Sequence, residues 1–227
     1  MNIKVYLPKP HIHFSEVEPF LSFVSSQRKE RIQKLVFEKD KILSLCTELL
    51  IRREISMDLS IEPYNIFLTT EKWGKPRLQH NEDYHFSVSN TQNAIVYVAS
   101  DSPIGIDVER IREFDSCENI ARRIMTPKEL RSMQESDQPQ LYFVETWTRK
   151  EAYTKMTGRG LLQPFNEVDV YAESVLRQIW SGIYDDYQIS VCTVNALIEP
   201  VKVVSVEDLL AYFTHSPNTL SETKYPG

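Results

Sequence analysis

Two acidic side chains stand two residues apart in a segment, Pro103–Glu109, whose alternation predicts a β-strand. Because side chains alternate along a strand, Asp107 and Glu109 point to one face together with Gly105, and the three aliphatic residues point to the other. Carboxylate oxygens suit Mg²⁺, which keeps several waters and usually bridges a few carboxylates to a substrate phosphate. The glycine leaves room for a close ligand. The alternative is a half-exposed antiparallel strand with acidic outer positions, which needs no metal.

A second group suited to phosphate chemistry lies on a helix predicted over about residues 141–156. Residues four apart stack on one helix face, so Trp147, Glu151 and Lys155 form one line. The carboxylate can join a metal or accept a proton, and the ammonium can neutralise charge on phosphate oxygens. Taken alone, Glu151 and Lys155 also fit a routine surface ion pair, but the aromatic residue on the same stripe indicates a covered face. The following Gly158–Gly160 fits either a helix stop or a close approach of a ligand or loop.

The elements that position these residues follow from hydrophobic periodicity. Apolar residues recur at three- and four-residue spacing over 38–57, which predicts a long helix with one buried face. Further helical segments are expected over 15–34 and 116–134. Strands are expected at 3–7, 66–70, 85–89, 94–99, 104–108, 168–171, 187–191 and 202–206, with a turn at Trp73–Pro76.

The two halves of the chain repeat an order of helix, strand and hairpin-like strands, and Asp83–Val88 resembles Asp186–Val191. The residues alone leave open whether this is duplication or chance. With duplication, we expect an α/β protein of the α+β type with two pseudo-symmetric halves and a ligand cleft between them. Each half would pack a small, mostly antiparallel sheet against a long helix. The predicted division is residues 1–103, residues 104–214 and a mobile polar tail at 215–227.

Composition excludes several classes of protein. A net charge of −6 over 227 residues argues against a nucleic-acid binder, although a local basic pocket can still hold an anion. The three cysteines are far apart and outside CxxC pairs, which argues against a disulfide framework and a zinc site. Because no apolar stretch is long enough to span a bilayer and no signal-peptide core is visible, we expect a cytoplasmic protein without a membrane partner.

The strand and the helix together resemble the signature pair of the 4′-phosphopantetheinyl transferase superfamily. That pattern is a strand with (V/I)GIDxE followed, about forty residues later, by a helix with WxxKEAxxK; here they are Ile104–Glu109 and Trp147–Lys155. The length and the doubled pattern resemble the monomeric, surfactin-synthetase-activating (Sfp-type) family rather than the short trimeric holo-acyl-carrier-protein synthases. The likeness extends to about Phe213. It implies the family's fold and a monomer of pseudo-dimeric architecture.

The resemblance implies an enzyme that transfers the phosphopantetheine arm of coenzyme A to a serine of an apo acyl or peptidyl carrier protein, releasing 3′,5′-ADP. Asp107, Glu109 and Glu151 would hold Mg²⁺, or Mn²⁺, against the pyrophosphate of coenzyme A. Glu151 would help to deprotonate the serine, and Lys155 would stabilise or protonate the leaving phosphate. Residues 1–103 would hold the nucleotide end of coenzyme A. The resemblance leaves open which carrier is served, that of fatty-acid, polyketide, nonribosomal-peptide or lysine biosynthesis.

Other positions match segments that contact coenzyme A in the family. Trp73–Pro76 resembles its GKP turn, and Phe86–Asn90 resembles its FN(I/V)SHS segment. The residues so implied are Arg28, Arg31, Ser44, Lys75, Pro76, Ser87, Ser89, Asn90, Lys150 and Lys155.

Two positions depart from the family pattern. Asn90 stands in place of a histidine and Leu43 in place of an arginine. Both changes are expected to weaken the hold on the 3′-phosphate of coenzyme A rather than the chemistry. Apart from the motifs, Arg28 and Arg31 fit a solvated helix face as well as they fit a contact with the phosphate.

A carrier-docking surface is expected close to the carboxylate strand in sequence, in a segment that offers basic and apolar residues. It would consist of Arg122, Arg123, Ile124 and Met125. Two other functions stay open: a Mg²⁺-dependent phosphoanhydride hydrolase, and a coenzyme A-binding module without catalysis. Against a hydrolase, the sequence shows no histidine cluster of the kind found in two-metal centres. Against a binding module, the presence of Asp107, Glu109, Glu151 and Lys155 together would be unexplained.

Overall fold

The computed structural model describes residues 2–6, 12–111, 117–160, 164–194 and 199–215. The chain forms two compact units, Met1–His11 with Phe67–Val204 and Ile12–Ile66 with Ser205–Gly227. We call them the sheet unit and the helical unit. The expected division at residue 103 concerns a sequence repeat rather than these units, and it stays a prediction. The tail expected at 215–227 lies almost wholly outside the described residues.

In the described part of the sheet unit, the two larger sheets share one core, and β2 (Leu68–Thr70) pairs with β3 (Pro76–Leu78) in a separate two-stranded sheet. The first sheet has the order β4-β5-β1-β9, with only the β1–β9 pair parallel. Its strands are β1 (Asn2–Tyr6), β4 (His85–Thr91), β5 (Ala94–Ser100) and β9 (Glu199–Val204). The expected hairpin over 85–99 is confirmed: Thr91 pairs with Ala94, and Asn93 takes the positive φ of 60° that the tight turn needs.

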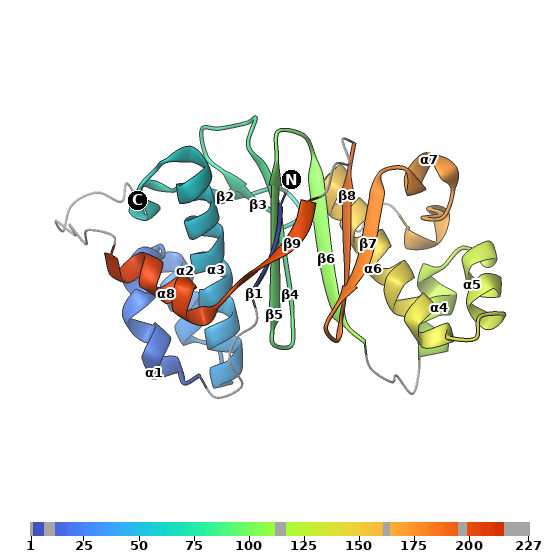
Figure 1. Cartoon of the computed structure of the whole chain (residues 1–227), viewed down its shortest axis with the longest axis horizontal. Coiled ribbons are helices and arrows are strands. Elements are labelled where there is room, and N and C mark those ends of the chain that lie inside the picture. Colours follow the sequence, from blue (N-terminus) through green and yellow to red (C-terminus); the bar gives the residue numbers. More distant parts are fainter. Residues whose placement is uncertain (1, 7–11, 112–116, 161–163, 195–198, 216–227) are drawn as a thin grey trace. The chain divides into compact units, whose positions relative to one another are not determined.

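The second sheet carries the acidic strand. Its strands are antiparallel in the order β6-β8-β7: β6 (Ile104–Arg110), β8 (Tyr187–Thr193) and β7 (Ile179–Tyr184). The aliphatic residues of β6 pack in a core with those of β8, β5 and β1. The long helix α6 (Pro139–Thr157) packs against β6 and β8 (Figure 1). The mostly antiparallel sheet with a long helix, expected from the sequence, is thus confirmed.

Shorter elements complete the sheet unit. They are β2 (Leu68–Thr70), β3 (Pro76–Leu78), α4 (Cys117–Ile124), α5 (Pro127–Gln134), η4 (Phe165–Glu167) and α7 (Glu173–Leu176). The start of α5 follows from its sequence: Thr126 and Glu129 form a reciprocal capping box, and Pro127 occupies the first turn.

The helical unit is built around one long helix, α3 (Glu38–Leu59), whose predicted apolar face is buried. The polar region expected to be helical over 15–34 is divided into α1 (Phe14–Val17), η1 (Glu18–Phe23) and α2 (Ser26–Gln33). The unit also holds η2 (Pro63–Asn65) and α8 (Val206–His215), and α8 contacts α3. In the described part of the chain, no helix is both long and apolar enough to cross a membrane.

The strand expected at 168–171 is wrong. This segment is irregular because side chains replace a strand partner: Val170 N–H donates to Glu129 Oε1 at 2.9 Å, and Val168 C=O accepts from Lys150 Nζ. The strand expected to reach residue 206 ends at Val204, and Val206 begins α8. Sequence periodicity missed β3, β7 and α8.

Candidate active site

Strand β6 divides its side chains between the core and helix α6, as the alternation predicted. Ile104, Ile106 and Val108 are almost fully buried in the core of the two sheets. Asp107 and Glu109 therefore lie on the opposite face. The predicted acidic face exists, and it lies under α6.

Gly105 is the point where α6 crosses the strand. A Cβ atom there would lie 2.0 Å from Ala152 O and 2.5 Å from Met156 N, both of them backbone atoms of α6. The room that we expected for a ligand is thus filled by the helix backbone. Glycine is needed because the close crossing brings α6, with Glu151 and Lys155, onto the acidic strand.

Asp107 is the centre of the polar contacts. Its side chain is buried, and its Oδ1 accepts hydrogen bonds from Ser89 Oγ at 2.7 Å and from Lys155 Nζ at 2.7 Å. Its Oδ2 is buried with no hydrogen-bond partner among the described residues. A buried carboxylate oxygen without a donor is costly unless a cation or a polar ligand satisfies it.

The two other acidic residues lie within electrostatic range of Asp107. Glu109 Oε2 accepts a hydrogen bond from Thr91 Oγ1 at 3.2 Å. Burial raises the pKa of Glu151, the charge of Asp107 raises it further, Lys155 lowers it, and Glu109 raises it again. The three carboxylates therefore repel one another, which a shared cation would relieve.

The carboxylates are not gathered around one point in this structure. In the residues that it describes, no three His, Cys, Asp or Glu side chains are close enough to hold a metal ion. The Lys155 ammonium instead contacts Asp107 Oδ1, Ser89 Oγ at 2.9 Å and Ile106 O at 3.0 Å. Three oxygen atoms around one ammonium show that this place favours positive charge.

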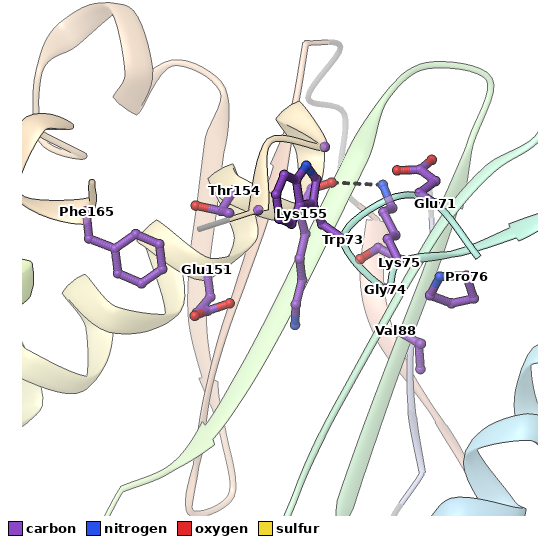
Figure 2. Close-up of a pocket in the computed structure, with 13 residues that line it drawn as sticks. Glu71, Trp73, Gly74, Lys75, Pro76, Val88, Glu151, Thr154, Lys155 and Phe165 are labelled. Atoms are coloured by element: carbon purple, nitrogen blue, oxygen red, sulfur yellow. Dashed lines mark hydrogen bonds between the residues drawn. The ribbon is translucent and has the colours of Figure 1, made fainter. Parts of the chain in front are cut away.

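A cavity of about 430 Å³ opens beside Glu151 and Lys155. Figure 2 shows these two side chains on α6 and Lys75 and Pro76 across the cavity. Lys75 Nζ donates to Ile104 O at 2.7 Å and to Lys155 O at 2.9 Å, so it ties the Trp73–Pro76 turn to β6 and α6. Burial lowers the pKa of Lys75, and the charge of Glu71 opposes this.

Aromatic residues form the rest of the cavity wall. Trp73 and Phe165 line it with Gly158 and Gly160. A Cβ at Gly160 would lie 2.6 Å from Trp73 Cγ, and Gly158 ends α6 with a φ of 65°. Both expected roles of the glycines are thus observed. No sequence pattern indicated Phe165, which begins the short 3₁₀ helix η4 after α6.

The serines of β4 connect that strand to β6. Ser87 Oγ accepts a hydrogen bond from Ile106 N–H at 3.1 Å, and Ser89 Oγ donates to Asp107. Ser87 also lines the cavity, whereas Asn90 is exposed. A contact of these residues with coenzyme A stays a prediction.

Three of the predicted basic and hydroxyl residues lie in the helical unit. Arg28 Nη2 donates to Ser44 O at 3.2 Å, and its Nε lies 3.8 Å from Glu48 Oε2. Burial lowers the pKa of Arg28, the charge of Glu48 opposes this, and Arg31 lowers it further. Arg28, Arg31 and Ser44 are thus neighbours, and the exposed Arg31 points its charge to the surface of this unit.

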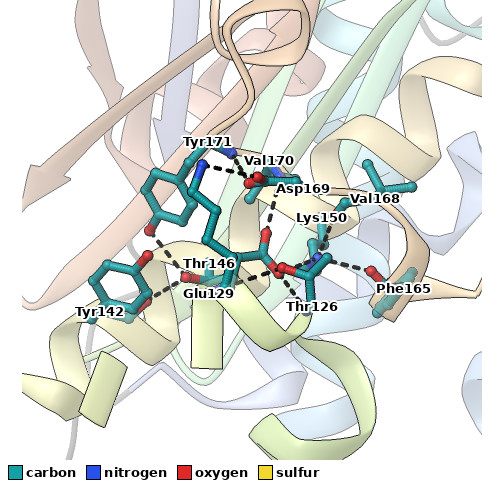
Figure 3. A network of polar contacts seen from close by, with 11 residues as sticks. Thr126, Glu129, Tyr142, Thr146, Lys150, Phe165, Val168, Asp169, Val170 and Tyr171 are labelled. Carbon is teal, nitrogen blue, oxygen red and sulfur yellow. Dashed lines mark hydrogen bonds and ion pairs between the residues drawn. The ribbon is translucent and has the colours of Figure 1, made fainter. Parts of the chain in front are cut away.

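Lys150 does not line the cavity. Its side chain is 1% exposed and is paired with Glu129 at 2.8 Å (Figure 3). The placement differs from the predicted contact with coenzyme A, because the amine points toward Glu129 of α5 and the backbone of Phe165 and Val168.

The expected docking residues are only partly at the surface. Arg122 and Arg123 are exposed and Ile124 is half-buried, but Met125 is 3% exposed and packs with Ala121 and Phe143. Met125 is therefore a core residue, and its expected contact with a carrier is corrected. The helical spacing of this amphipathic segment turns it inward.

Both parts of the chain match families of known proteins. Residues 103–199 match the family model described as 4′-phosphopantetheinyl transferase superfamily, and residues 11–102 match that described as 4′-phosphopantetheinyl transferase, N-terminal. A 4′-phosphopantetheinyl transferase of Bacillus pumilus (psf-1) is 30% identical over 86% of this chain and 89% of its own.

Two further relatives carry the same description. The 4′-phosphopantetheinyl transferase gsp of Aneurinibacillus migulanus is 29% identical over 88% of this chain and 89% of its own. The 4′-phosphopantetheinyl transferase Sfp of Bacillus subtilis is 27% identical over 73% of this chain and 74% of its own. The match to the family model over residues 103–199 includes both the acidic strand and the helix that carries Glu151 and Lys155.

Proposed function

Because the chain belongs to the 4′-phosphopantetheinyl transferase superfamily and is an Sfp-like transferase of phosphopantetheine to carrier proteins, we propose how its residues perform that transfer. Asp107, Glu109 and Glu151 would hold one Mg²⁺ or Mn²⁺ ion, which would neutralise charge on the pyrophosphate of coenzyme A. The products are the loaded carrier and 3′,5′-ADP. The enzyme acts as a monomer.

The residues present fit a hard divalent cation. Asp107 Oδ2 is a buried oxygen with no partner in the described part of the chain, and Oδ1 is paired with an ammonium. Mg²⁺ usually retains several waters and takes one or two carboxylates with substrate phosphates, so a complete protein cage is not required. When bound, the ion neutralises charge on the pyrophosphate.

Glu151 and Lys155 supply proton transfer and charge stabilisation. Glu151 would accept the proton of the carrier serine, directly or through a water, because its carboxylate lines the cavity beside Lys155. The serine oxygen then forms a bond to the β-phosphorus as the bond from that phosphorus to the bridging oxygen breaks. Lys155, released from Asp107, meets the α-phosphate of the departing 3′,5′-ADP.

The observation that carries this proposal is the contact of Lys155 with Asp107 at 2.7 Å beside the cavity. To test it, the protein is incubated with coenzyme A, Mg²⁺ and an apo carrier, and the carrier is weighed by mass spectrometry. A gain of one phosphopantetheine per carrier, lost on chelation of the metal, is expected. Release of 3′,5′-ADP without change of the carrier would instead indicate hydrolysis, and neither change would indicate a binding module.

A relaxed demand for the 3′-phosphate of coenzyme A is a further expectation. Asn90 offers hydrogen bonds but no charge, and Leu43 offers neither. The rate with 3′-dephospho-coenzyme A should therefore lie only about 10- to 150-fold below the rate with coenzyme A, since one lost charge-assisted hydrogen bond is worth about 1.5–3 kcal/mol and about 1.4 kcal/mol corresponds to a factor of ten. Steady-state kinetics with both substrates checks this, and a complete loss with the dephospho form refutes it.

Arg122 and Arg123 are proposed to attract the acidic carrier. The double variant Arg122→Glu/Arg123→Glu should raise the KM for the carrier about fivefold or more and leave the KM for coenzyme A unchanged, because rim charges act mainly on encounter. Arg177→Glu is the matched control: Arg177, like Arg122, is an exposed arginine paired with a glutamate four residues earlier on a helix. Equal effects of both variants would contradict a local docking surface.

A further inference from the structure

We infer that Lys150 and Glu129 are positioning residues that fix the Phe165 wall of the cavity and thereby set the affinity for coenzyme A. The inference rests on the proposed function of that cavity. It gives Lys150 a role different from a direct contact with the substrate.

The pair is enclosed by protein. Both side chains are 1% exposed, and Lys150 Nζ lies 2.8 Å from Glu129 Oε2. Breaking a buried ion pair leaves an uncompensated charge, so such a pair holds its surroundings in one arrangement. The two residues come from α5 and α6, which are thereby joined.

The ammonium has no donor left for a phosphate. An ammonium has three N–H groups, and those of Lys150 meet Glu129 Oε2, Phe165 O at 2.8 Å and Val168 O. The side chain would have to leave all three acceptors to reach a ligand. Its chemistry in this structure is therefore to hold backbone.

Glu129 completes the connection. Its Oε1 accepts from Val170 N–H at 2.9 Å and its Oε2 from Thr126 N–H at 2.8 Å. Together the two side chains bind both ends of the segment 165–170, which has no strand partner of its own (Figure 3). The segment's conformation therefore depends on this ion pair.

This segment carries a wall of the cavity. Phe165 lines it, and its ring packs edge-on against Trp147, with centroids 5.8 Å apart. Lys150, which precedes Glu151 on α6, thus acts on the cavity through the backbone of Phe165. Displacement of the wall is expected to weaken ground-state and transition-state binding equally, which raises KM and spares kcat.

The test uses Lys150→Met, Glu129→Gln, Lys150→Arg and Phe165→Ala, each measured for KM and kcat with coenzyme A and for direct binding of coenzyme A by calorimetry. Lys150→Met and Glu129→Gln are expected to raise KM and the dissociation constant to the same extent, about five- to twentyfold, with kcat changed less than threefold. Lys150→Arg, which can donate to the same acceptors, should restore most of the affinity. In the double variant Lys150→Met/Phe165→Ala, the increase in the dissociation constant should be smaller than the product of the increases in the two single variants.

Different outcomes separate the possible failures. If Lys150→Met weakens binding while Glu129→Gln leaves it unchanged, Lys150 contacts the substrate and the inference is wrong. Multiplying effects of Lys150→Met and Phe165→Ala would also overturn it. Failure of the unmodified protein to bind coenzyme A or load a carrier would refute the proposed function itself. Phe165→Ala does not break the ion pair, so it reports on the wall even where the Lys150 variants do not fold.

Discussion

Asp107→Asn is expected to lower kcat for carrier loading about 10²- to 10³-fold, the usual loss when one electrostatic contact to a transition state is removed. The amide keeps the size of the carboxylate, but it removes the charge and turns an N–H toward the proposed position of the cation. The amide oxygen can still accept from Lys155, whose contact at 2.7 Å is thereby kept without the opposite charge. Because Lys155 is 25% exposed, its amine can reach water, so the melting temperature should change little. Mass spectrometry of the carrier over time gives the rate.

Asp186→Asn provides the control for this substitution. Asp186 is an exposed acid that pairs with Arg110 at 3.2 Å. Its substitution therefore removes the same charge as Asp107→Asn, but from the surface of the protein. It should load the carrier at the unmodified rate. A loss in Asp107→Asn no larger than that in Asp186→Asn would contradict a metal role for Asp107.

Gly105→Ala is expected to damage both stability and activity. The new Cβ would collide with Ala152 O and Met156 N. Since backbone atoms of a helix cannot turn aside, α6 must move away from β6. Overpacking costs typically about 1–3 kcal/mol. A displacement of Glu151 and Lys155 by about 1 Å would lower kcat about 100-fold. Thermal unfolding followed by circular dichroism, together with carrier-loading kinetics, measures the two effects.

Gly182→Ala is a matched control on β7 of the same sheet. A Cβ at Gly182 would come within 2.8 Å of the far end of the Trp180 side chain, which can rotate away. This variant should lose less stability than Gly105→Ala and keep kcat. Retention of full activity by Gly105→Ala would show that the close crossing of α6 and β6 does not position the catalytic residues.

Local patterns predicted much of the fold and the element faces on which the candidate site residues lie. The alternation of β6 placed Asp107 on the face away from the core, and the four-residue spacing placed Glu151 and Lys155 on one face of α6. Both follow from the geometry of single elements. The start of α8 also had a local signal, since Ser205 and Asp208 form a capping pair three residues apart.

The remaining features depend on partners distant in sequence. The residues of 168–170 alternate as a strand does, yet Glu129 and Lys150 take their backbone groups. The crossing at Gly105 and the contact of Lys155 with Asp107 arise only when α6 packs on β6. The periodicity of one segment does not show which side chains from distant parts of the sequence will contact that segment.

The most direct measurement is a crystal structure of the protein with coenzyme A and Mn²⁺, in which anomalous scattering locates the ion. We predict one peak at about 2.0–2.2 Å from carboxylate oxygens of Asp107, Glu109 and Glu151, as a hard hexacoordinate cation requires, with Lys155 moved from Asp107 to the pyrophosphate. An ion bound to the pyrophosphate alone, with Lys155 still on Asp107, would contradict the account.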